Sequence, residues 1–285
     1  MNQIDTLILS GGRPSGIAYI GIFKALFEKN ILTRDLSGIQ EIITTSAGIL
    51  FSILYMLNIK ENIIENFILN LDLLSFLNVD NLEINDLLIH FGLFNNHKIG
   101  ETIESFIRHT LHIENITLKE FYEKIPILLT VKVFNVTKKQ IEYISYKNNP
   151  DLKLSLLSEM TTAIPFFFKP VQYNDCLYVD GGLRGHFPIE NNKSENYLGL
   201  FVLGGSIPKE SNLLDLFPIL RFIHSLMINQ DDIIHQIKNG QKFKNIIYTE
   251  INQGLNFDLS DTQKKEIIQK GYQNTINHIN KYLTD

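Results

Sequence analysis

The sequence predicts an α/β fold in which helices cover a parallel sheet, because two strand-turn-helix units follow one another. An apolar run at 6–10 ends in two glycines, and apolar residues spaced three and four apart follow at 15–30. A second apolar strand at 38–46 leads into a second helical segment at 47–59. Successive units of this kind are typical of parallel sheets with helical layers.

The middle of the chain changes character, since segments within residues 60–124 have helical periodicity. We expect this region to form a helical insertion or cap. Two apolar strands return at 125–135 and 140–146, and the short polar segment between them predicts a hairpin. A helical pattern from residue 155 should end at Pro165, because proline cannot continue a helix.

Two further apolar runs, at 176–182 and 197–205, end in glycines and are predicted as strands. The remainder, 206–285, is expected to be mostly helical. Its last helix should begin with a capping box from Ser260 to Gln263.

The composition limits the possible classes of protein. The chain has 285 residues, 44% of them hydrophobic, which suits a single domain over 1–285. A net charge of −5 without a basic stretch argues against nucleic-acid binding. The one cysteine, Cys176, excludes an internal disulfide framework and fits a reducing compartment.

The first residues lack the basic region of a signal peptide. The most apolar run, 47–57, is about half the roughly 20 residues that a membrane span needs. We therefore expect a cytoplasmic protein. The eight histidines do not stand at metal-ligand spacing, so neither a metal site nor a cofactor is expected. Nothing in the sequence indicates an oligomeric state.

Three glycine-containing turns follow apolar strands, and side chains at the carboxyl ends of parallel strands often carry chemistry. The first turn, SGGRPSG at 10–16, lacks the lysine of a nucleotide phosphate loop and the second glycine of a dinucleotide fingerprint. Its backbone N–H groups, near a helix N-terminus, suit an anion or the oxyanion of acyl transfer. Taken alone, it is more often a plain turn.

The second turn, TTSAG, places Ser46 where serine hydrolases with a G-x-S-x-G motif have their nucleophile, with Thr44 in place of the first glycine. Serine is also a common helix N-cap, and Ser46 alone favours that interpretation. The third turn begins at Asp180, which ends an apolar strand before two glycines. It either makes a turn or provides a carboxylate that accepts the proton of Ser46.

In this order along the chain, the three motifs resemble those of the patatin-like phospholipase family. LILSGGRPSGIAYIG is similar to its first strand and glycine-rich loop, TTSAG to its G-x-S-x-G, and the D-G-G from Asp180 to its aspartate motif. The segment 161–182 resembles the family's A-x-P-x-x-F stretch, and 91–99 resembles its G-L-[FY] stretch. The likeness runs from about residue 6 to residue 190.

The resemblance implies a three-layer α/β/α sandwich around a mostly parallel sheet. It also implies a Ser–Asp dyad without a histidine, in which Ser46 attacks an ester carbonyl to form an acyl-enzyme and Asp180 acts as general base. The oxyanion would be held by backbone N–H groups around Gly11, Gly12 and Arg13.

By the same resemblance, Thr44 and Gly48 flank the nucleophile in its elbow. The implied substrates are phospholipids, lysophospholipids or other glycerolipids, reached through transient contact with a membrane surface. The family's chemistry needs no metal or cofactor.

The sequence departs from the family pattern at several positions. Thr44 replaces a glycine of the elbow, Arg13 replaces the third glycine of the oxyanion loop, and Ser15 stands where arginine or lysine is common. Pro14 has no N–H, so a hole that needed this donor would lose about 10²–10³ in turnover. Arg13 either faces a phospholipid phosphate or lies on the surface. We interpret His186 as a loop residue.

Three functions remain open at this point. The first is a lipid acyl hydrolase, which is favoured because both Ser46 and Asp180 are present. The second is a catalytically weak relative that binds lipid or a partner protein. The third is an acyltransferase, which would share the acyl-enzyme and differ only in the group that accepts the acyl chain.

Overall fold

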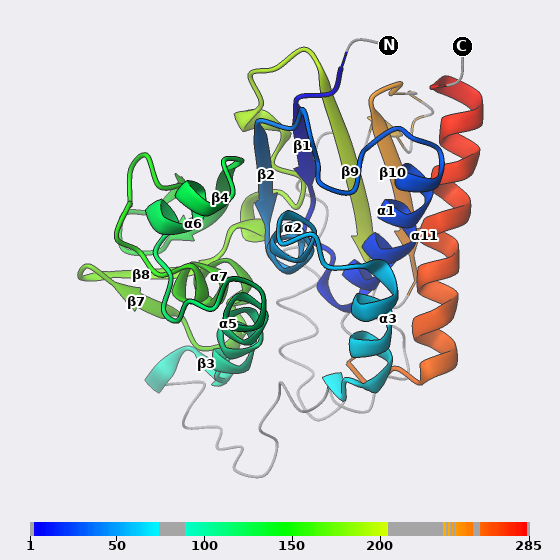
Figure 1. The fold of residues 1–285 in the computed structure, drawn as a ribbon. Coiled ribbons are helices and arrows are strands. Elements are labelled where there is room, and N and C mark those ends of the chain that lie inside the picture. The colour runs from blue at the N-terminus through cyan, green and yellow to red at the C-terminus, as the bar shows by residue number, and fades with distance from the viewer. Residues whose placement is uncertain are drawn as a thin grey trace.

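The computed structural model describes residues 3–73, 89–204, 236–237, 239, 241, 243–252 and 257–283. Within them, one large sheet occupies the centre of the molecule (Figure 1). Its strands are β1 (Thr6–Leu9), β2 (Glu41–Thr45), β4 (Leu128–Asn135), β5 (Gln140–Ile144), β7 (Val171–Tyr173), β8 (Cys176–Asp180), β9 (Tyr197–Gly204) and β10 (Ile246–Ile251).

The strands follow the order β10-β9-β1-β2-β4-β8-β7, with β5 paired to β4 beside this path. From β10 to β4 every neighbouring pair is parallel. Strands β5 and β8 run antiparallel to β4, and β7 runs antiparallel to β8. The sheet is therefore mostly parallel, as predicted, with an antiparallel flank.

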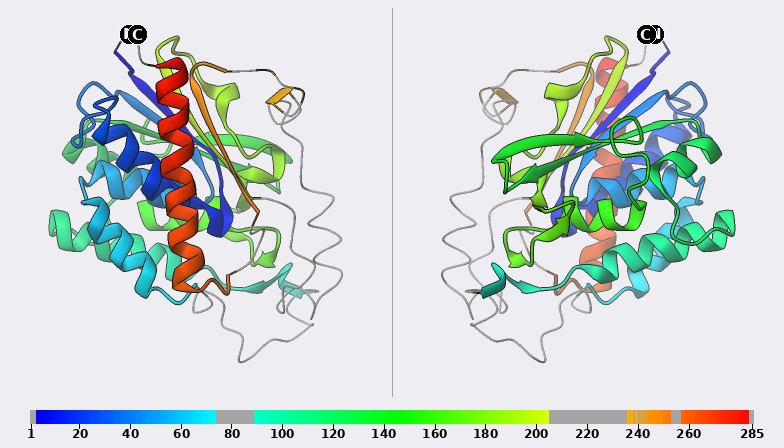
Figure 2. Two further views of the ribbon diagram at one scale, coloured as in Figure 1. Left: turned by 90° about the vertical axis from the view of Figure 1, so that its right-hand side faces the viewer. Right: turned by 90° about the vertical axis from the view of Figure 1, so that its left-hand side faces the viewer.

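Helices flank the sheet, and α11 extends along it beside α1 (Figure 2). The shorter strands β3 (Gly92–Phe94) and β6 (Phe166–Phe168) form a separate parallel pair. The α-helices are α1 (Ala18–Glu28), α2 (Gly48–Met56), α3 (Glu61–Asn70), α5 (His97–Leu111), α6 (Leu118–Lys124), α7 (Leu154–Thr162) and α11 (Asp261–Tyr282), and the 3-10 helices are η1 (Arg13–Ile17), η4 (Gly181–Arg184) and η5 (Ile189–Asn191).

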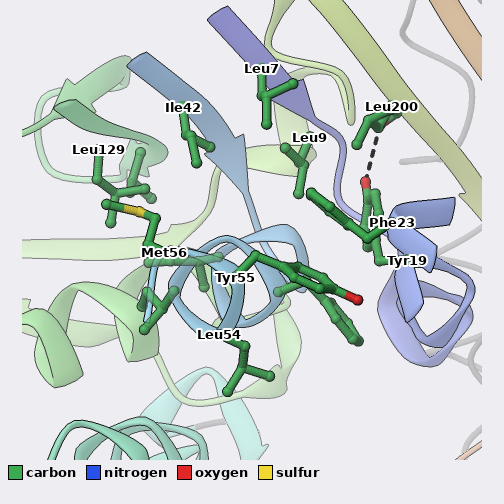
Figure 3. Packing of buried hydrophobic residues seen from close by; sticks show 14 of the residues in the cluster. Leu7, Leu9, Tyr19, Phe23, Ile42, Leu54, Tyr55, Met56, Leu129 and Leu200 are labelled. Carbon is green, nitrogen blue, oxygen red and sulfur yellow. Dashed lines mark hydrogen bonds between the residues drawn. The ribbon is translucent and has the colours of Figure 1, made fainter. Parts of the chain in front are cut away.

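Side chains alternate between two cores, because successive residues of a strand point to opposite faces. On β1, Leu7 and Leu9 belong to the larger core with the helices, whereas Ile8 belongs to a smaller core on the other face. In the larger core the rings of Phe23 and Tyr55 stack with centroids 3.8 Å apart (Figure 3). Each such buried side chain contributes about 1.5–3 kcal/mol by leaving water.

Tyr19 joins α1 to the middle of β9 and to the residue that follows β1. Its hydroxyl lies 2.8 Å from the carbonyl oxygen of Ser10 and 3.1 Å from that of Leu200 (Figure 3). This contact fixes the start of α1 against the sheet edge where the turn after β1 lies.

Several predicted elements are confirmed. The hairpin of β4 and β5 forms across the polar segment between them. Helix α7 ends at Thr162, before Pro165, and α11 begins with the capping box between Ser260 and Gln263. Helices α3, α5 and α6 occupy much of the predicted helical insertion.

Two expectations need correction. The region 60–124 also contains the strand β3, and the region 206–285 contains β10 between its predicted helices. Strand β10 pairs in parallel with β9 over its whole length, from Ile246 to Ile251. The parts of these predictions at 74–88 and 205–235 lie outside the described residues.

Candidate active site

Ser46 lies in a sharp turn between β2 and α2. Its backbone has a left-handed conformation, with φ of +52°, which is uncommon for a residue other than glycine and concentrates at functional sites. Its N–H donates to Thr161 Oγ1 at 2.8 Å, and its carbonyl oxygen accepts from the N–H of Ile49 at 3.0 Å. The strand-to-helix turn expected from TTSAG is present.

The hydroxyl of Ser46 does not cap α2. It donates to Asp180 Oδ2 at 2.6 Å, and the N-terminus of α2 has no side-chain cap hydrogen bond. Both residues are buried, with exposed fractions of 4% and 5%. The interpretation of Ser46 as a helix cap is therefore wrong.

Thr44 fits at the first position of the elbow because Gly48 leaves room for it. A Cβ atom at Gly48 would lie 2.4 Å from Thr44 Oγ1 and 2.7 Å from the carbonyl oxygen of Ser10. Thr44 is fully buried, and its hydroxyl has no hydrogen-bond partner in the described part of the chain. A side chain at position 48 would therefore collide with Thr44 and with the backbone of Ser10.

Asp180 reaches Ser46 from a strand that runs in the opposite direction to β1 and β2. Within the antiparallel pair of β8 and β4, Asp180 lies opposite Val133. The preceding residue, Lys132, pairs with Thr45 at the end of β2. Strand β4 thus continues beyond β2, and β8 returns along this extension to the level of Ser46. Asp180 therefore lies at the same edge of the sheet as Ser46, as expected, although its strand β8 is antiparallel to its neighbour β4.

The carboxylate of Asp180 has two hydrogen-bond donors. Oδ2 accepts from the Ser46 hydroxyl, and Oδ1 accepts from the N–H of Gly182 at 2.7 Å. Burial raises the pKa of Asp180 to about 6, although these two donors and the positive charges of Arg13 and Lys132 oppose that shift. Near neutral pH most of the carboxyl group is ionised, so it can accept a proton.

The loop after β1 lies directly against the turn that contains Ser46. A Cβ atom at Gly11 would be 3.0 Å from Ser46 Cβ, so glycine permits the close approach. The Gly11 N–H donates to the carbonyl oxygen of His186 at 2.8 Å and is therefore already used. The N–H groups of Gly12 and Arg13 make no hydrogen bond within the described residues. This narrows the expected oxyanion donors to Gly12 and Arg13.

Pro14 lies in the first turn of η1, where its missing N–H would have no helical acceptor in any case. Arg13 precedes it with φ of +53°. Its Nη1 atom is buried and has no hydrogen-bond partner in the described part of the chain, which argues against a surface arginine, one of the two alternatives left open by the sequence. Burial lowers the pKa of Arg13 to about 10, against the opposing effect of Asp180, and the guanidinium stays protonated at neutral pH.

His186 lies in the loop between η4 and η5, as expected. A Cβ atom at Gly182 would be 2.9 Å from its Nδ1. Burial, together with the positive charges of Arg13 and Lys132, lowers the pKa of His186 to about 3, so its ring is neutral at physiological pH.

Two cavities meet at Ser46. A cavity of about 30 Å³ covers the Ser46–Asp180 pair and is bordered by Gly11, Gly12 and His186. A second cavity, of about 110 Å³, extends from Ser46 between α2, α3 and α5 and has almost wholly apolar walls. Its side chains include Ile17, Leu50, Phe51, Ile68, Ile99 and Phe168.

Among the described residues, no group of three or more histidine, cysteine, aspartate or glutamate side chains is placed to hold a metal ion. None of the helices in this part of the chain has the length and apolarity to cross a membrane.

The sequence of the chain matches the profile of a known protein family. The profile described as patatin-like phospholipase matches residues 7–192, which include both Ser46 and Asp180. The chain belongs to this family. Its mostly parallel sheet with flanking helices is the patatin-like fold.

Two viral proteins are similar to this chain in sequence. The chain is 33% identical over 187 residues to a probable lipid hydrolase, 463L, of Invertebrate iridescent virus 6, and the match covers 65% of this chain and 62% of that protein. It is 24% identical to protein R571 of Acanthamoeba polyphaga mimivirus, over 99% of this chain and 96% of the other.

Two solved structures share the fold. VipD from Legionella pneumophila matches with a TM-score of 0.69 and 16% identity, covering 98% of this chain and 67% of its own. ExoU from Pseudomonas aeruginosa, in complex with SpcU, matches with a TM-score of 0.57 and 14% identity, covering 99% and 53% respectively. This chain therefore spans about half the length of ExoU.

The sequence analysis did not single out Thr161, which accepts the Ser46 N–H, or Lys132, whose charge faces Asp180. Both are isolated polar residues without a recognisable motif. An isolated lysine in an otherwise apolar strand was the one available signal, because a charged side chain inside a sheet needs buried partners.

Proposed function

We propose that the protein is a lipid acyl hydrolase of the phospholipase A or lysophospholipase type that uses Ser46 and Asp180 as its catalytic pair. The observation that carries this proposal is the 2.6 Å hydrogen bond between Ser46 Oγ and Asp180 Oδ2 at the mouth of an apolar cavity. A nucleophile with a base belongs to acyl transfer, and the cavity suits the acyl chain of a lipid.

In the proposed reaction, Ser46 Oγ forms a bond to the ester carbonyl carbon while its proton passes to Asp180. The carbonyl oxygen becomes an oxyanion, which the N–H groups of Gly12 and Arg13 stabilise. The C–O bond to the glycerol then breaks, and the leaving oxygen takes the proton from Asp180. An acyl-Ser46 ester remains.

Deacylation repeats these steps with water. Asp180 takes a proton from the water as its oxygen bonds to the acyl carbon, and the tetrahedral intermediate collapses with departure of Ser46 Oγ. The serine recovers its proton from Asp180, and a fatty acid is released. His186, which borders the same cavity as the pair, is neutral and takes no part in this proposal.

The guanidinium of Arg13, whose Nη1 has no hydrogen-bond partner among the described residues, favours phospholipids over neutral glycerolipids. Its Nη1 is buried beside the catalytic pair, and Arg13 borders both cavities. A phosphate on the glycerol would give this cation a partner, and guanidinium-phosphate contacts are strong.

Transient contact with a membrane is part of the proposal. Ile63 on α3 and Phe91 beside β3 are 49% and 56% exposed, and Ile89 is 66% exposed. Helix α3 and strand β3 both lie toward the end of the molecule to which β1 and β2 point (Figure 1). The net charge of −5 suggests that apolar insertion, rather than attraction to anionic lipid, would dominate.

The test is release of fatty acid from phosphatidylcholine, lysophosphatidylcholine and diacylglycerol vesicles by the native protein and two variants. We expect Ser46→Ala and Asp180→Asn each to lower kcat by at least about 10³-fold while remaining folded. Activity that persists in Ser46→Ala would refute the assignment of the nucleophile. A native protein that binds these lipids without releasing fatty acid would favour a lipid-binding relative instead.

An acyltransferase would share every step up to the acyl-enzyme. Adding glycerol or a lysophospholipid to the same assay separates the two, since a transferase forms a new ester at the expense of free fatty acid.

A further inference from the structure

Lys132 is a buried charge that the reaction above does not use. It lies on β4, and 1% of its side chain is exposed. Burying an ammonium group is costly unless its three protons find partners. Its Nζ donates to the carbonyl oxygens of Arg184 at 2.9 Å and Gly185 at 3.0 Å, and to Glu190 Oε1 at 2.6 Å. All three partners belong to the segment that follows Asp180.

The backbone of Lys132 contacts the other catalytic segment. Its carbonyl oxygen accepts from Thr45 Oγ1 at 3.1 Å and from Thr161 Oγ1 at 2.8 Å. Thr161 Oγ1 in turn accepts the Ser46 N–H at 2.8 Å. One carbonyl group therefore holds the end of β2 directly and the strained nucleophile turn through a single side chain.

The first residue after Asp180 is packed against the same carbonyl group. A Cβ atom at Gly181 would lie 2.5 Å from the carbonyl oxygen of Lys132 and 2.8 Å from its Cγ. The segment that contains Ser46 and the segment that follows Asp180 thus both contact Lys132.

We propose that Lys132 is a positioning residue that sets the separation of Ser46 Oγ and the Asp180 carboxylate, with its carbonyl group holding the serine and its ammonium group holding the aspartate segment. This inference rests on the proposed function, because it assigns Lys132 a part in that reaction. An error of about 1 Å between reacting groups costs up to about 10²-fold in rate, so such a tether affects turnover strongly.

The ammonium group also contributes a positive charge to the surroundings of Asp180. The other groups that face this carboxylate are the Arg13 guanidinium, the Ser46 hydroxyl, the N–H of Gly182 and the neutral ring of His186. Loss of one of the two positive charges destabilises the carboxylate form, so the carboxyl group should then become protonated at higher pH.

The main variant is Lys132→Met, which keeps an unbranched side chain one atom shorter and removes its charge and its donors. We expect kcat to fall by about 10–100-fold with KM changed by less than about twofold. The acid limb of the pH profile of kcat/KM should move to higher pH, because the positive charge of Lys132 lowers the pKa of Asp180. Lys132→Arg retains the charge and should return the acid limb to its native position.

The chain offers a matched control in Lys264, which is also buried. Its Nζ donates to the carbonyl oxygens of Leu69 at 3.1 Å and Leu71 at 2.7 Å, and lies 3.7 Å from Asp261 Oδ1. Lys264→Met should lower the Tm by an amount similar to that of Lys132→Met, because it leaves the same kinds of group unpaired. The acid limb of the kcat/KM profile of Lys264→Met should stay at its native pH. A shift equal to that of Lys132→Met would overturn the proposal.

Amide hydrogen exchange tests the tether without reference to activity. Exchange followed by mass spectrometry should be faster in peptides covering 42–50 and 181–190 of Lys132→Met, and in neither peptide of Lys264→Met. If only 181–190 exchanges faster, Lys132 does not couple the two segments and the proposal fails. If the native protein releases no fatty acid, the proposed function fails, while exchange still decides whether the coupling exists.

A second variant covers the case in which Lys132→Met does not fold. Glu190→Gln keeps the shape of the partner and weakens one of the three ammonium contacts. Faster exchange in both peptides, with kcat lowered about threefold or more, is expected. Unchanged exchange in 42–50 would overturn the proposal.

Discussion

Replacing Asp180 by asparagine should make the protein more stable at neutral pH while removing its activity. Asp180 is 5% exposed, and burial raises its pKa from 3.8 to about 6. A carboxyl group with a raised folded-state pKa stabilises the fold at low pH, and this contribution is lost as the pH rises through 6. Asparagine has a similar shape and does not ionise, so it escapes this loss.

The magnitude follows from the shift of about two pKa units. One unit corresponds to about 1.4 kcal/mol, so ionisation of Asp180 in the folded protein costs about 3 kcal/mol above pH 6. Part of this cost is already present at pH 4, because the unfolded carboxyl group is about half ionised there. The difference in free energy of unfolding between Asp180→Asn and the native protein should therefore grow by about 2–3 kcal/mol between pH 4 and pH 8.

Urea denaturation at four or five pH values between 4 and 8 measures this difference directly. Ser46→Ala serves as the control, because it removes a donor to the same carboxylate and keeps the carboxyl group. A difference between Asp180→Asn and the native protein that stays constant from pH 4 to pH 8 would refute a raised pKa for Asp180. The kinetic counterpart is an acid limb of kcat/KM near pH 6, below which the carboxyl group is protonated and cannot act as a base.

Three further predictions test individual contacts. Gly48→Ala should lower the Tm and reduce kcat at least about 10²-fold, because its Cβ would lie 2.4 Å from Thr44 Oγ1. A variant with native turnover in a lipase assay would contradict the packing of the turn around Ser46. Thr161→Val should lower kcat about 10-fold, because it leaves the buried N–H of Ser46 unpaired. Thr275→Val alters a buried threonine on α11 and should keep the native kcat. Equal losses of kcat in the two variants would refute a role for the Thr161 contact. Arg13→Gln should reduce fatty acid release from phosphatidylcholine about 10-fold more than release from diacylglycerol, and an equal effect on both substrates would remove Arg13 from phosphate recognition.

The motifs and the sheet that carries them are readable from the sequence, because both depend on local patterns. Strand-turn-helix periodicity predicts β1, β2 and their helices, and the order of the three turns indicates the family. The contacts that distinguish this site are not local. Whether the Ser46 hydroxyl caps α2 or reaches Asp180 depends on where β8 ends, and that depends on the length by which β4 extends beyond β2.

The direction of β8 illustrates the same limit. An apolar run that ends in an aspartate and two glycines has the same appearance whether its strand pairs in parallel or antiparallel. The partner strand decides, and β4 was identified only as one arm of a hairpin. Lys132 and Thr161 were missed for a related reason, because the roles of isolated polar residues follow from tertiary neighbours that no spacing rule identifies.

The central claim is that Ser46 is a nucleophile activated by Asp180, and covalent labelling with a fluorophosphonate probe tests it most directly. Peptide mass spectrometry should locate one adduct on Ser46 of the native protein, formed faster as the pH rises through about 6. Ser46→Ala should form none, and Asp180→Asn should react at least about 10²-fold more slowly at pH 7 and above, where Asp180 of the native protein is ionised. An adduct at another residue, or equal labelling rates in native protein and Asp180→Asn, would contradict the account.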